Sequence, residues 1–265
     1  MIRILHTIDT TGPGGAETVF TNLATGLDSN KYESYAAIRG PGWVCDTLRK
    51  HGLEPIFINS RGSFNVRYLL DLIKIIRSYK IDIVQSHLFG SNVYCSLAGL
   101  ICLVPVISTF HGFVDTNKGE KLMPLKAWLI NRGSRKLIFV SDRLREHYIQ
   151  AYGFSEHKSA TIYNGVDTSV FYPNKDDSIR KELGLSPENI LIGAVGNIRP
   201  AKGYDVFLQA ARLIYDKHPE CRFVVAGQGA GMLYKSLLEL RKKLDLKEVF
   251  HFIGFKPDPA MVFNN

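Results

Sequence analysis

The chain of 265 residues has few cysteines, and none lies in a metal-binding or redox pattern. The four are Cys45, Cys95, Cys102 and Cys221, and no two of them form a Cys-x-x-Cys pair. This spacing argues against the common zinc sites and against a disulfide framework, and it favours a reduced, cytoplasmic setting. Cys95 and Cys102 lie seven residues apart in an apolar stretch, which indicates positions in the core.

The sequence also lacks a clear signal peptide or membrane span. Ile2–Ile8 is too short and too polar for the apolar part of a signal peptide, and Asp9 follows it. The uncharged stretch Leu88–Phe110 is long enough to be considered as a span, but Asn92 and Pro105 interrupt it. A buried helix followed by a buried strand explains this stretch better.

Glycine-rich loops are present, but none has the fingerprint of a dinucleotide enzyme or a P-loop enzyme. Glu17 and Met232 stand where the third glycine of Gly-x-Gly-x-x-Gly belongs, in the loops that begin at Gly12 and Gly227. The loop Gly196–Gly203 lacks the Gly-Lys-Ser/Thr of a Walker A motif. These departures argue against NAD enzymes and P-loop NTPases.

The net charge is +8, and a local excess of cations lies between residues 118 and 146. Such a patch suits anionic lipid headgroups, a nucleic acid or a polyanionic acceptor, and a solvated helix face explains it equally well. The cations are Lys118, Lys121, Lys126, Arg132, Arg135, Lys136, Arg143 and Arg145, against Glu120, Asp142 and Glu146.

Short apolar runs alternate with longer amphipathic ones through the first part of the chain. The apolar runs are nearly continuous in Val, Ile, Leu and Phe, which is typical of parallel strands covered on both faces. The alternation predicts a doubly wound α/β sheet. Expected strands are Ile2–Ile8, Ser34–Ile38, Glu54–Ile58, Ile83–Gln85, Val106–Phe110, Lys136–Val140 and Ala160–Ile162. Expected helices are Ala16–Leu27, Val44–His51, Val66–Tyr79, Asn92–Cys102, Leu122–Asn131 and Asp142–Tyr152.

A second α/β domain is expected after a polar, proline-broken linker. The predicted boundaries are residues 1–170 for the first domain, 171–188 for the linker and 189–265 for the second domain. The second domain has about three predicted strands, Ile190–Val195, Arg222–Ala226 and Val249–Ile253. The predicted helices are Tyr204–Lys217, Met232–Leu244 and a short one from Pro259, with another over Ile179–Leu183 before the first strand. We expect Ile190–Val195 to present a bare, apolar edge.

The loop Gly196–Gly203 directly follows the apolar run Ile190–Val195 and carries two cations, Arg199 and Lys202. A helix is expected to begin near Gly203. Free backbone N–H groups and the helix dipole favour an anion at such a place. The loop therefore predicts a site for a phosphorylated or nucleotide-linked ligand.

Two histidines end neighbouring predicted strands, and side chains at the carboxyl ends of such strands face the ligand crevice. We expect His111 to hydrogen-bond a ligand and His87 to be a capping or packing residue. Gly14-Gly15, in the loop after the first strand, fits either a tight turn or a close backbone approach to a substrate.

Taken together, these motifs resemble retaining glycosyltransferases of family 4, which have the GT-B fold of two facing Rossmann-like domains. The resemblance spans essentially the whole chain. The resembling segments are Gly14–Glu17, Thr109–Gly112, Ile162–Asp167, Gly196–Gly203 and Val225–Gly229.

The resemblance implies a sugar transferred with retention from a nucleotide-sugar donor to a polysaccharide or lipid-linked acceptor, without a metal ion and without a cofactor. The chain has no Asp-x-Asp metal pair, which agrees with this. The implied protein is cytoplasmic or peripheral at the inner face of the membrane, with an anionic membrane as a candidate contact and no nucleic-acid partner.

The family pattern also assigns site residues. Arg199 and Lys202 match the cationic pair that holds the donor diphosphate, although most members have arginine where this chain has Asn197. His111 is the catalytic candidate, expected near the reacting carbon of the donor sugar. The other expected donor-binding residues are Gly14, Gly15, Gly196 and Asn164.

One departure from the family pattern is large. The family's glutamate pair, seven residues apart, and its returning C-terminal helix have no counterpart here, so we expect an incomplete second domain and little turnover by this chain alone. The alternatives are a non-catalytic remnant or interaction protein, and another GT-B enzyme such as a nucleotide-sugar 2-epimerase.

Overall fold

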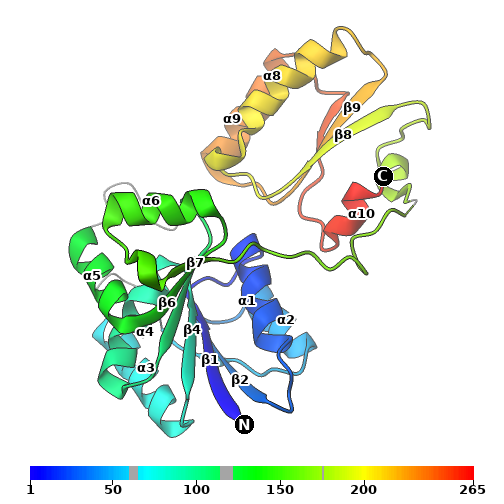
Figure 1. Cartoon of the computed structure of the whole chain (residues 1–265). Coiled ribbons are helices and arrows are strands. Elements are labelled where there is room, and N and C mark those ends of the chain that lie inside the picture. The colour runs from blue at the N-terminus through cyan, green and yellow to red at the C-terminus, as the bar shows by residue number, and fades with distance from the viewer. Residues whose placement is uncertain (60–64, 114–121, 175) are drawn as a thin grey trace. The chain divides into compact units, whose positions relative to one another are not determined.

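A computed structural model of the chain describes residues 1–59, 65–113, 122–174 and 176–265. Lys118, Glu120 and Lys121 of the expected basic patch lie outside these ranges. The chain forms two compact units, Met1–Gly165 and Val166–Asn265, each with its own parallel sheet (Figure 1). The whole fold is α/β, as the sequence predicts. In the described part of the chain, no helix has the length and apolar character needed to cross a bilayer.

The first unit is built on a seven-stranded parallel sheet in the order β3-β2-β1-β4-β5-β6-β7. The strand order reverses between β1 and β4, and the ligand crevice of such sheets lies at the carboxyl ends of the strands beside this point. The strands are β1 (Ile2–Ile8), β2 (Tyr32–Ile38), β3 (Ile56–Phe57), β4 (Ile83–His87), β5 (Val106–Phe110), β6 (Ser134–Phe139) and β7 (Ser159–Thr161).

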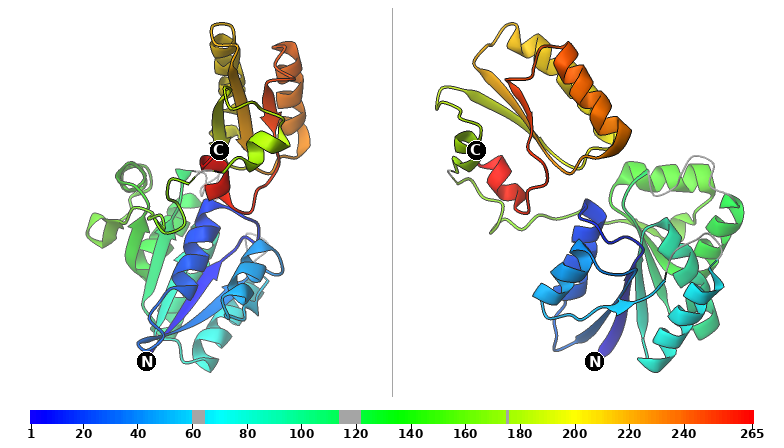
Figure 2. Two further views of the ribbon diagram at one scale, coloured as in Figure 1. Left: turned by 90° about the vertical axis from the view of Figure 1, so that its right-hand side faces the viewer. Right: turned by 180° about the vertical axis from the view of Figure 1, so that it is seen from behind.

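Helices cover both faces of this sheet (Figures 1 and 2). One face carries α1 (Gly15–Thr25) and α2 (Trp43–Lys50), whose buried side chains form one core cluster with β1 and β2. The other face carries α3 (Val66–Ser78), α4 (Phe89–Cys102) and α5 (Met123–Gly133). The helix α6 (Asp142–Tyr152) and the short 3₁₀ helix η2 (Glu156–Lys158) lead from β6 into β7.

Local sequence signals set several of these helix ends. The side chain of Asn65 accepts a hydrogen bond from Tyr68 N at 2.9 Å and caps α3, and Ser141 Oγ accepts from Leu144 N at 3.3 Å and caps α6. Gly153 ends α6 with a φ of 66°, a left-handed conformation that glycine adopts without strain.

The second unit has a three-stranded parallel sheet in the order β10-β9-β8, so β8 lies at one end of this order. Two longer helices, α8 and α9, pack on one face, and two short ones, α7 and α10, lie on the other (Figure 1). The elements are α7 (Ser178–Glu182), β8 (Ile190–Val195), η3 (Pro200–Lys202), α8 (Tyr204–Tyr215), β9 (Cys221–Ala226), α9 (Gly231–Lys243), β10 (Phe250–Phe252) and α10 (Pro259–Phe263).

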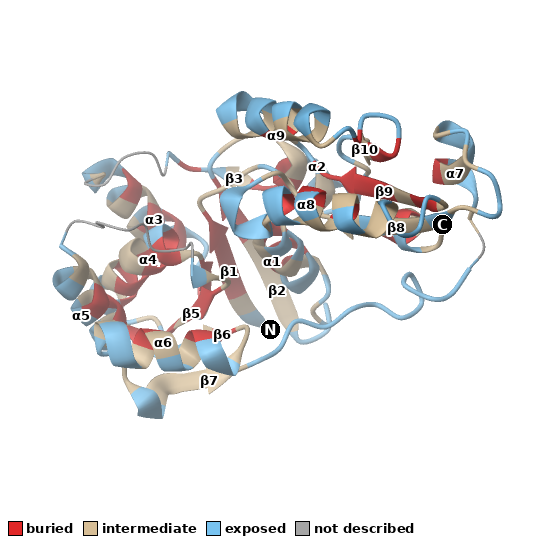
Figure 3. Ribbon diagram, turned by 90° about the horizontal axis from the view of Figure 1, so that it is seen from above, coloured by how far each residue is buried: buried red, intermediate tan, exposed pale blue. Residues whose placement is uncertain are grey.

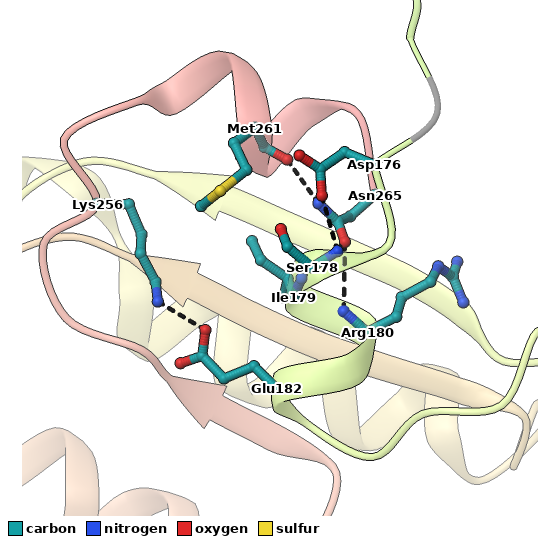
Figure 4. A network of polar contacts seen from close by, with 8 residues as sticks. All are labelled: Asp176, Ser178, Ile179, Arg180, Glu182, Lys256, Met261 and Asn265. Atoms are coloured by element: carbon teal, nitrogen blue, oxygen red, sulfur yellow. Dashed lines mark hydrogen bonds and ion pairs between the residues drawn. The ribbon is translucent and has the colours of Figure 1, made fainter.

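Polar contacts join the two short helices of the second unit (Figure 4). Asn265 Oδ1 accepts from Ile179 N at 2.9 Å and from Arg180 N at 3.3 Å, which satisfies amides in the first turn of α7. Lys256 Nζ lies 2.7 Å from Glu182 Oε2. These contacts therefore join the last ten residues of the chain to α7, which lies far from them in the sequence.

Candidate functional site

The carboxyl ends of β4 and β5 bring two histidines into contact in the first unit. His87 is the last residue of β4, and β4 pairs with β5 so that His87 lies opposite Thr109. His111 lies two residues beyond Thr109, and its Nε2 atom is 2.9 Å from Nδ1 of His87. The two rings are nearly parallel, with centroids 5.1 Å apart.

Both imidazoles are neutral at physiological pH. Burial, followed by the nearby His111 and His6, lowers the pKa of His87 well below its usual value. Burial lowers the pKa of His111 to about 4. One of the two facing nitrogens therefore donates an N–H to the other, in a direction set by the tautomers, and the pair can form hydrogen bonds without carrying a positive charge. The contact of His87 with His111 was not expected from the sequence.

The loop between β1 and α1 carries the two predicted glycines, and they have different surroundings. Gly14 is in an extended conformation, and a Cβ atom on it would lie 2.3 Å from Oε2 of Glu17. A Cβ atom on Gly15 would meet no described atom within 4 Å. Packing against Glu17 accounts for Gly14, whereas the space beside Gly15, the first residue of α1, leaves room for a ligand.

A partly buried carboxylate, Asp9, follows β1 and was not singled out from the sequence as a site residue. Ser91 N, in the first turn of α4, donates a hydrogen bond to it, and a Cβ atom on Gly90 would lie 2.4 Å from its Oδ2 atom. Burial raises the pKa of Asp9, while its backbone hydrogen bonds and Arg39 oppose that shift. Asp9 therefore fixes the start of the β1–α1 loop to the amino end of α4. The signal in the sequence that could have identified Asp9 is its place as an acidic residue directly after an apolar strand.

The cationic loop of the second unit follows β8, as predicted. Gly196 has a φ of 156°, Tyr204 Oη donates to its carbonyl oxygen at 2.7 Å, and the amide of Gly196 donates to Ala226 O at 2.8 Å. The helix α8 then begins at Tyr204, after Gly203 in the left-handed conformation with φ 62°. No side chain in the described part of the unit caps the first turn of α8.

Lys202 lies against Gly196. A Cβ atom built on Gly196 would be 3.0 Å from Cε and 3.4 Å from Nζ of Lys202, so the ammonium group folds back over the end of β8. Arg199 and Lys202 are both exposed, and neither pairs with a carboxylate among the described residues. Two unneutralised cations beside an uncapped helix start make this loop a place for an anion.

A second loop, after β9, is held against the first. Asn197 Oδ1 accepts from Gln228 N at 3.0 Å, and Ile198 N donates to Gln228 O at 2.8 Å. A Cβ atom on Gly227 would lie 1.9 Å from Gly196 O, so only glycine allows this approach. Asn197, which stands where most members of the resembling family have arginine, therefore joins the two loops.

The predicted site residues fall in both units. The first unit contains Gly14, Gly15 and His111, and the second contains Gly196, Arg199 and Lys202. Asn164 also belongs to the first unit, in a stretch from 162 to 174 in which every residue is exposed. Among the residues that the structure describes, no three His, Cys, Asp or Glu side chains converge as metal ligands do.

Comparison with known proteins places this chain among glycosyltransferases. Residues 13–170 match the model described as Glycosyltransferase Family 4, and residues 175–265 match the one described as Glycosyl transferases group 1.

Two curated relatives carry names of this class. The chain is 29% identical over 216 residues to the UDP-Gal:alpha-D-GlcNAc-diphosphoundecaprenol alpha-1,3-galactosyltransferase of Escherichia coli, covering 76% of this chain and 56% of that protein. It is 26% identical over 198 residues to the D-inositol 3-phosphate glycosyltransferase of Kribbella flavida, covering 68% of this chain and 46% of that protein. The chain thus spans about half the length of these relatives.

A solved structure has the same fold. The crystal structure of Anabaena HepE in complex with UDP and glucose matches with a TM-score of 0.85 and 19% identity, over 100% of this chain and 72% of that chain. This likeness confirms the predicted fold class, the GT-B type with a seven-stranded sheet and a smaller three-stranded sheet.

Proposed function

Because the chain belongs to Glycosyltransferase Family 4, we propose that it transfers a sugar from a nucleotide-sugar donor to an acceptor, with retention of configuration and without a metal ion. The donor is proposed to be a UDP-sugar, since the Escherichia coli relative is named for UDP-Gal and the HepE crystals contain UDP. The acceptor is proposed to be a lipid-linked precursor or a polysaccharide. The reaction would then take place in the cytoplasm or at the inner face of the membrane.

The position of Lys202 is the observation that carries this proposal. As the glycosidic bond of the donor breaks, negative charge builds up on the leaving diphosphate. The Lys202 ammonium lies over Gly196, beside the uncapped start of α8, and Arg199 adds a second cation on the same loop. Fixed positive charges and amide dipoles aimed at a leaving diphosphate stabilise the transition state.

The first unit supplies groups suited to a sugar. Neutral His111, in contact with His87, is proposed to hydrogen-bond a hydroxyl group of the donor sugar near the reacting carbon. An uncharged imidazole suits this role because it can hydrogen-bond a hydroxyl group without attracting a phosphate. The space beside Gly15 is proposed to admit the donor phosphate or the acceptor.

Calorimetry with UDP and uridine tests the donor site without requiring turnover. The wild-type chain is expected to bind UDP more tightly than uridine, because only UDP carries the diphosphate. Removal of a charge-assisted hydrogen bond costs about 1.5–3 kcal/mol, so Lys202→Ala should weaken UDP binding roughly tenfold or more and leave uridine binding unchanged. Lys242→Ala removes an exposed lysine at the end of α9 and serves as the matched control.

The possible outcomes separate the alternatives. Equal loss of UDP affinity in Lys202→Ala and Lys242→Ala would remove Lys202 from the site. No binding of any nucleotide by the wild-type chain would favour an interaction protein. If nucleotide binds, product analysis with and without an acceptor distinguishes transfer of the sugar from its epimerisation.

A further inference from the structure

Tyr204, the first residue of α8, ties the cationic loop of the second unit to the core. Its ring is only 4% exposed and belongs to the core cluster that also contains Leu208 and Phe223. Buried and exposed residues alternate along α8, and the buried ones pack on the sheet (Figure 3). The Tyr204 hydroxyl reaches back across the loop and donates a hydrogen bond to Gly196 O at 2.7 Å. A buried ring on a helix therefore holds the end of β8 through one hydrogen bond.

The side chain of Lys202 lies against the same glycine. A Cβ atom built on Gly196 would be 3.0 Å from Lys202 Cε, 3.3 Å from Tyr204 Oη and 3.4 Å from Lys202 Nζ. An ammonium group and a hydroxyl group therefore meet at one residue, whose carbonyl oxygen is an acceptor suited to either of them. The hydroxyl makes the hydrogen bond with this oxygen, and no described residue accepts one from the ammonium group.

A lysine of the first unit shows the other arrangement, in which carbonyl oxygens hold the ammonium group. Lys158 Nζ donates to Asn131 O and, at 2.9 Å, to Ser134 O. Two of the three donors of that ammonium group are thus committed to the backbone. Lys202 lies beside a carbonyl oxygen that Tyr204 already occupies, so its donors remain available to a ligand.

We propose that Tyr204 is a positioning residue for Lys202. Its hydroxyl takes the Gly196 carbonyl oxygen and fixes the peptide that follows Gly196, so that the Lys202 ammonium lies ready for the diphosphate of the donor. Tyr204 does not contact the ligand and acts only through the lysine. This inference rests on the proposed function, because it concerns the site at which Lys202 is proposed to bind.

Two further observations support this role. Burial raises the pKa of Tyr204, so its hydroxyl stays protonated and remains a donor at neutral and mildly alkaline pH. The same peptide is held from its other side, because Asn197 Oδ1 accepts from Gln228 N at 3.0 Å and a Cβ atom on Gly227 would lie 1.9 Å from Gly196 O. Tyr204 completes this set of contacts, and a loop that is ordered before the ligand arrives binds at a lower entropic cost.

Calorimetric titrations with UDP, pyrophosphate and uridine test the proposal with the full chain. Tyr204→Phe removes the hydroxyl and keeps the buried ring. It should weaken the binding of UDP and of pyrophosphate about threefold to tenfold, the effect of one hydrogen bond, and leave uridine binding unchanged. A variant that was merely less well folded would lose affinity for uridine as well. Tyr215→Phe, at the other end of α8, is the matched control, because no described residue hydrogen-bonds that hydroxyl.

A double-mutant cycle with Lys202→Ala tests whether Tyr204 acts through the lysine. Once Lys202 is absent, Tyr204→Phe should change UDP affinity by less than about twofold, because the two residues then share one effect and their losses do not add. Tyr204→4-aminophenylalanine keeps an N–H donor on the same ring and should restore most of the wild-type affinity for UDP. A role that depended only on filling the core would show no such rescue, because phenylalanine already fills it.

The outcomes separate this inference from the proposed function. Unchanged UDP affinity in Tyr204→Phe, or an equal loss with and without Lys202, would overturn the role of Tyr204 and leave the donor site intact. A wild-type chain that binds UDP no better than uridine, or that loses nothing on Lys202→Ala, would contradict the donor site itself, and the role of Tyr204 would fail with it.

Discussion

The buried imidazole of His6 makes the stability of the first unit depend on pH. His6 lies in β1 with 1% of its surface exposed, and burial lowers its pKa from 6.5 to about 4. Such a group takes up a proton on unfolding, so its contribution to stability is complete above pH 6.5 and is lost as the pH falls toward 4. Between pH 8 and pH 5 we expect this residue to lower the free energy of unfolding by about 2 kcal/mol.

Urea denaturation at several pH values measures this effect as a difference between variants. His6→Leu should flatten the fall in the free energy of unfolding between pH 8 and pH 5, whatever its effect on stability at pH 8. His218→Gln, at an exposed position in the second unit, is the control for the replacement of a histidine. A His6→Leu protein with the wild-type slope would show that His6 takes up no extra proton on unfolding.

The sequence predicted the contacts between individual side chains less well than it predicted the helices and strands. The pair formed by His87 and His111 depends on the pairing of β4 with β5, and no local pattern gives that register. The contact of Asn197 with Gln228 likewise joins loops 31 residues apart. The position of His111 at the end of a strand could be inferred from the pattern of apolar runs, whereas its neighbour could not.

At the scale of elements, the packing of α4 on α5 depends on one glycine. A Cβ atom on Gly133 would lie 2.3 Å from the carbonyl oxygen and 2.7 Å from the Cβ atom of Ser96. Alanine in place of glycine helps a helix by roughly 0.5–1 kcal/mol, but a clash with backbone forces the helices apart and typically costs about 1–3 kcal/mol. We expect the cost of the clash to exceed the gain in helix propensity, because the hydroxyl groups of Ser96 and Ser134 also hydrogen-bond at this contact, at 2.9 Å.

Gly133→Ala should therefore lower the free energy of unfolding in urea by about 1–2 kcal/mol. Gly165→Ala is the matched control, because a Cβ atom there would meet no described atom within 4 Å and the residue lies in an exposed stretch. Equal stability of the two variants would mean that α4 and α5 can separate at little cost.

The order and type of the elements followed from the sequence, and the differences lie at element ends. Ile2–Ile8, Val106–Phe110 and Ile190–Val195 are strands with the predicted bounds. The third strand is shorter than predicted, Ile56–Phe57, because Pro55 has no N–H group to offer the sheet. The helix α4 begins at Phe89, three residues early, since Gly90 and Ser91 are poor helix formers and hid its first turn in the sequence.

At the scale of the molecule, each unit has a core of its own. Buried clusters fill the first unit on both faces of its sheet, and separate clusters centred on Phe223 and Val224 fill the second. The chain that joins them is exposed at every described position from 162 to 174. Because proteases cut exposed, irregular chain first, this stretch should be the most sensitive part of the described molecule.

Limited digestion with chymotrypsin should therefore cut first after Tyr163, Phe171 or Tyr172, which are 65%, 36% and 51% exposed. Mass spectrometry should find an amino-terminal fragment that ends at one of these residues and resists further cleavage, because its sheet and both helical layers are complete without the second unit. Trp128, similarly exposed but within α5, is the internal control, since a helix must unwind locally to enter a protease. First cleavage at Trp128 would show instead that α5 opens more readily than the joining stretch. It would contradict the prediction that the first unit stays folded by itself.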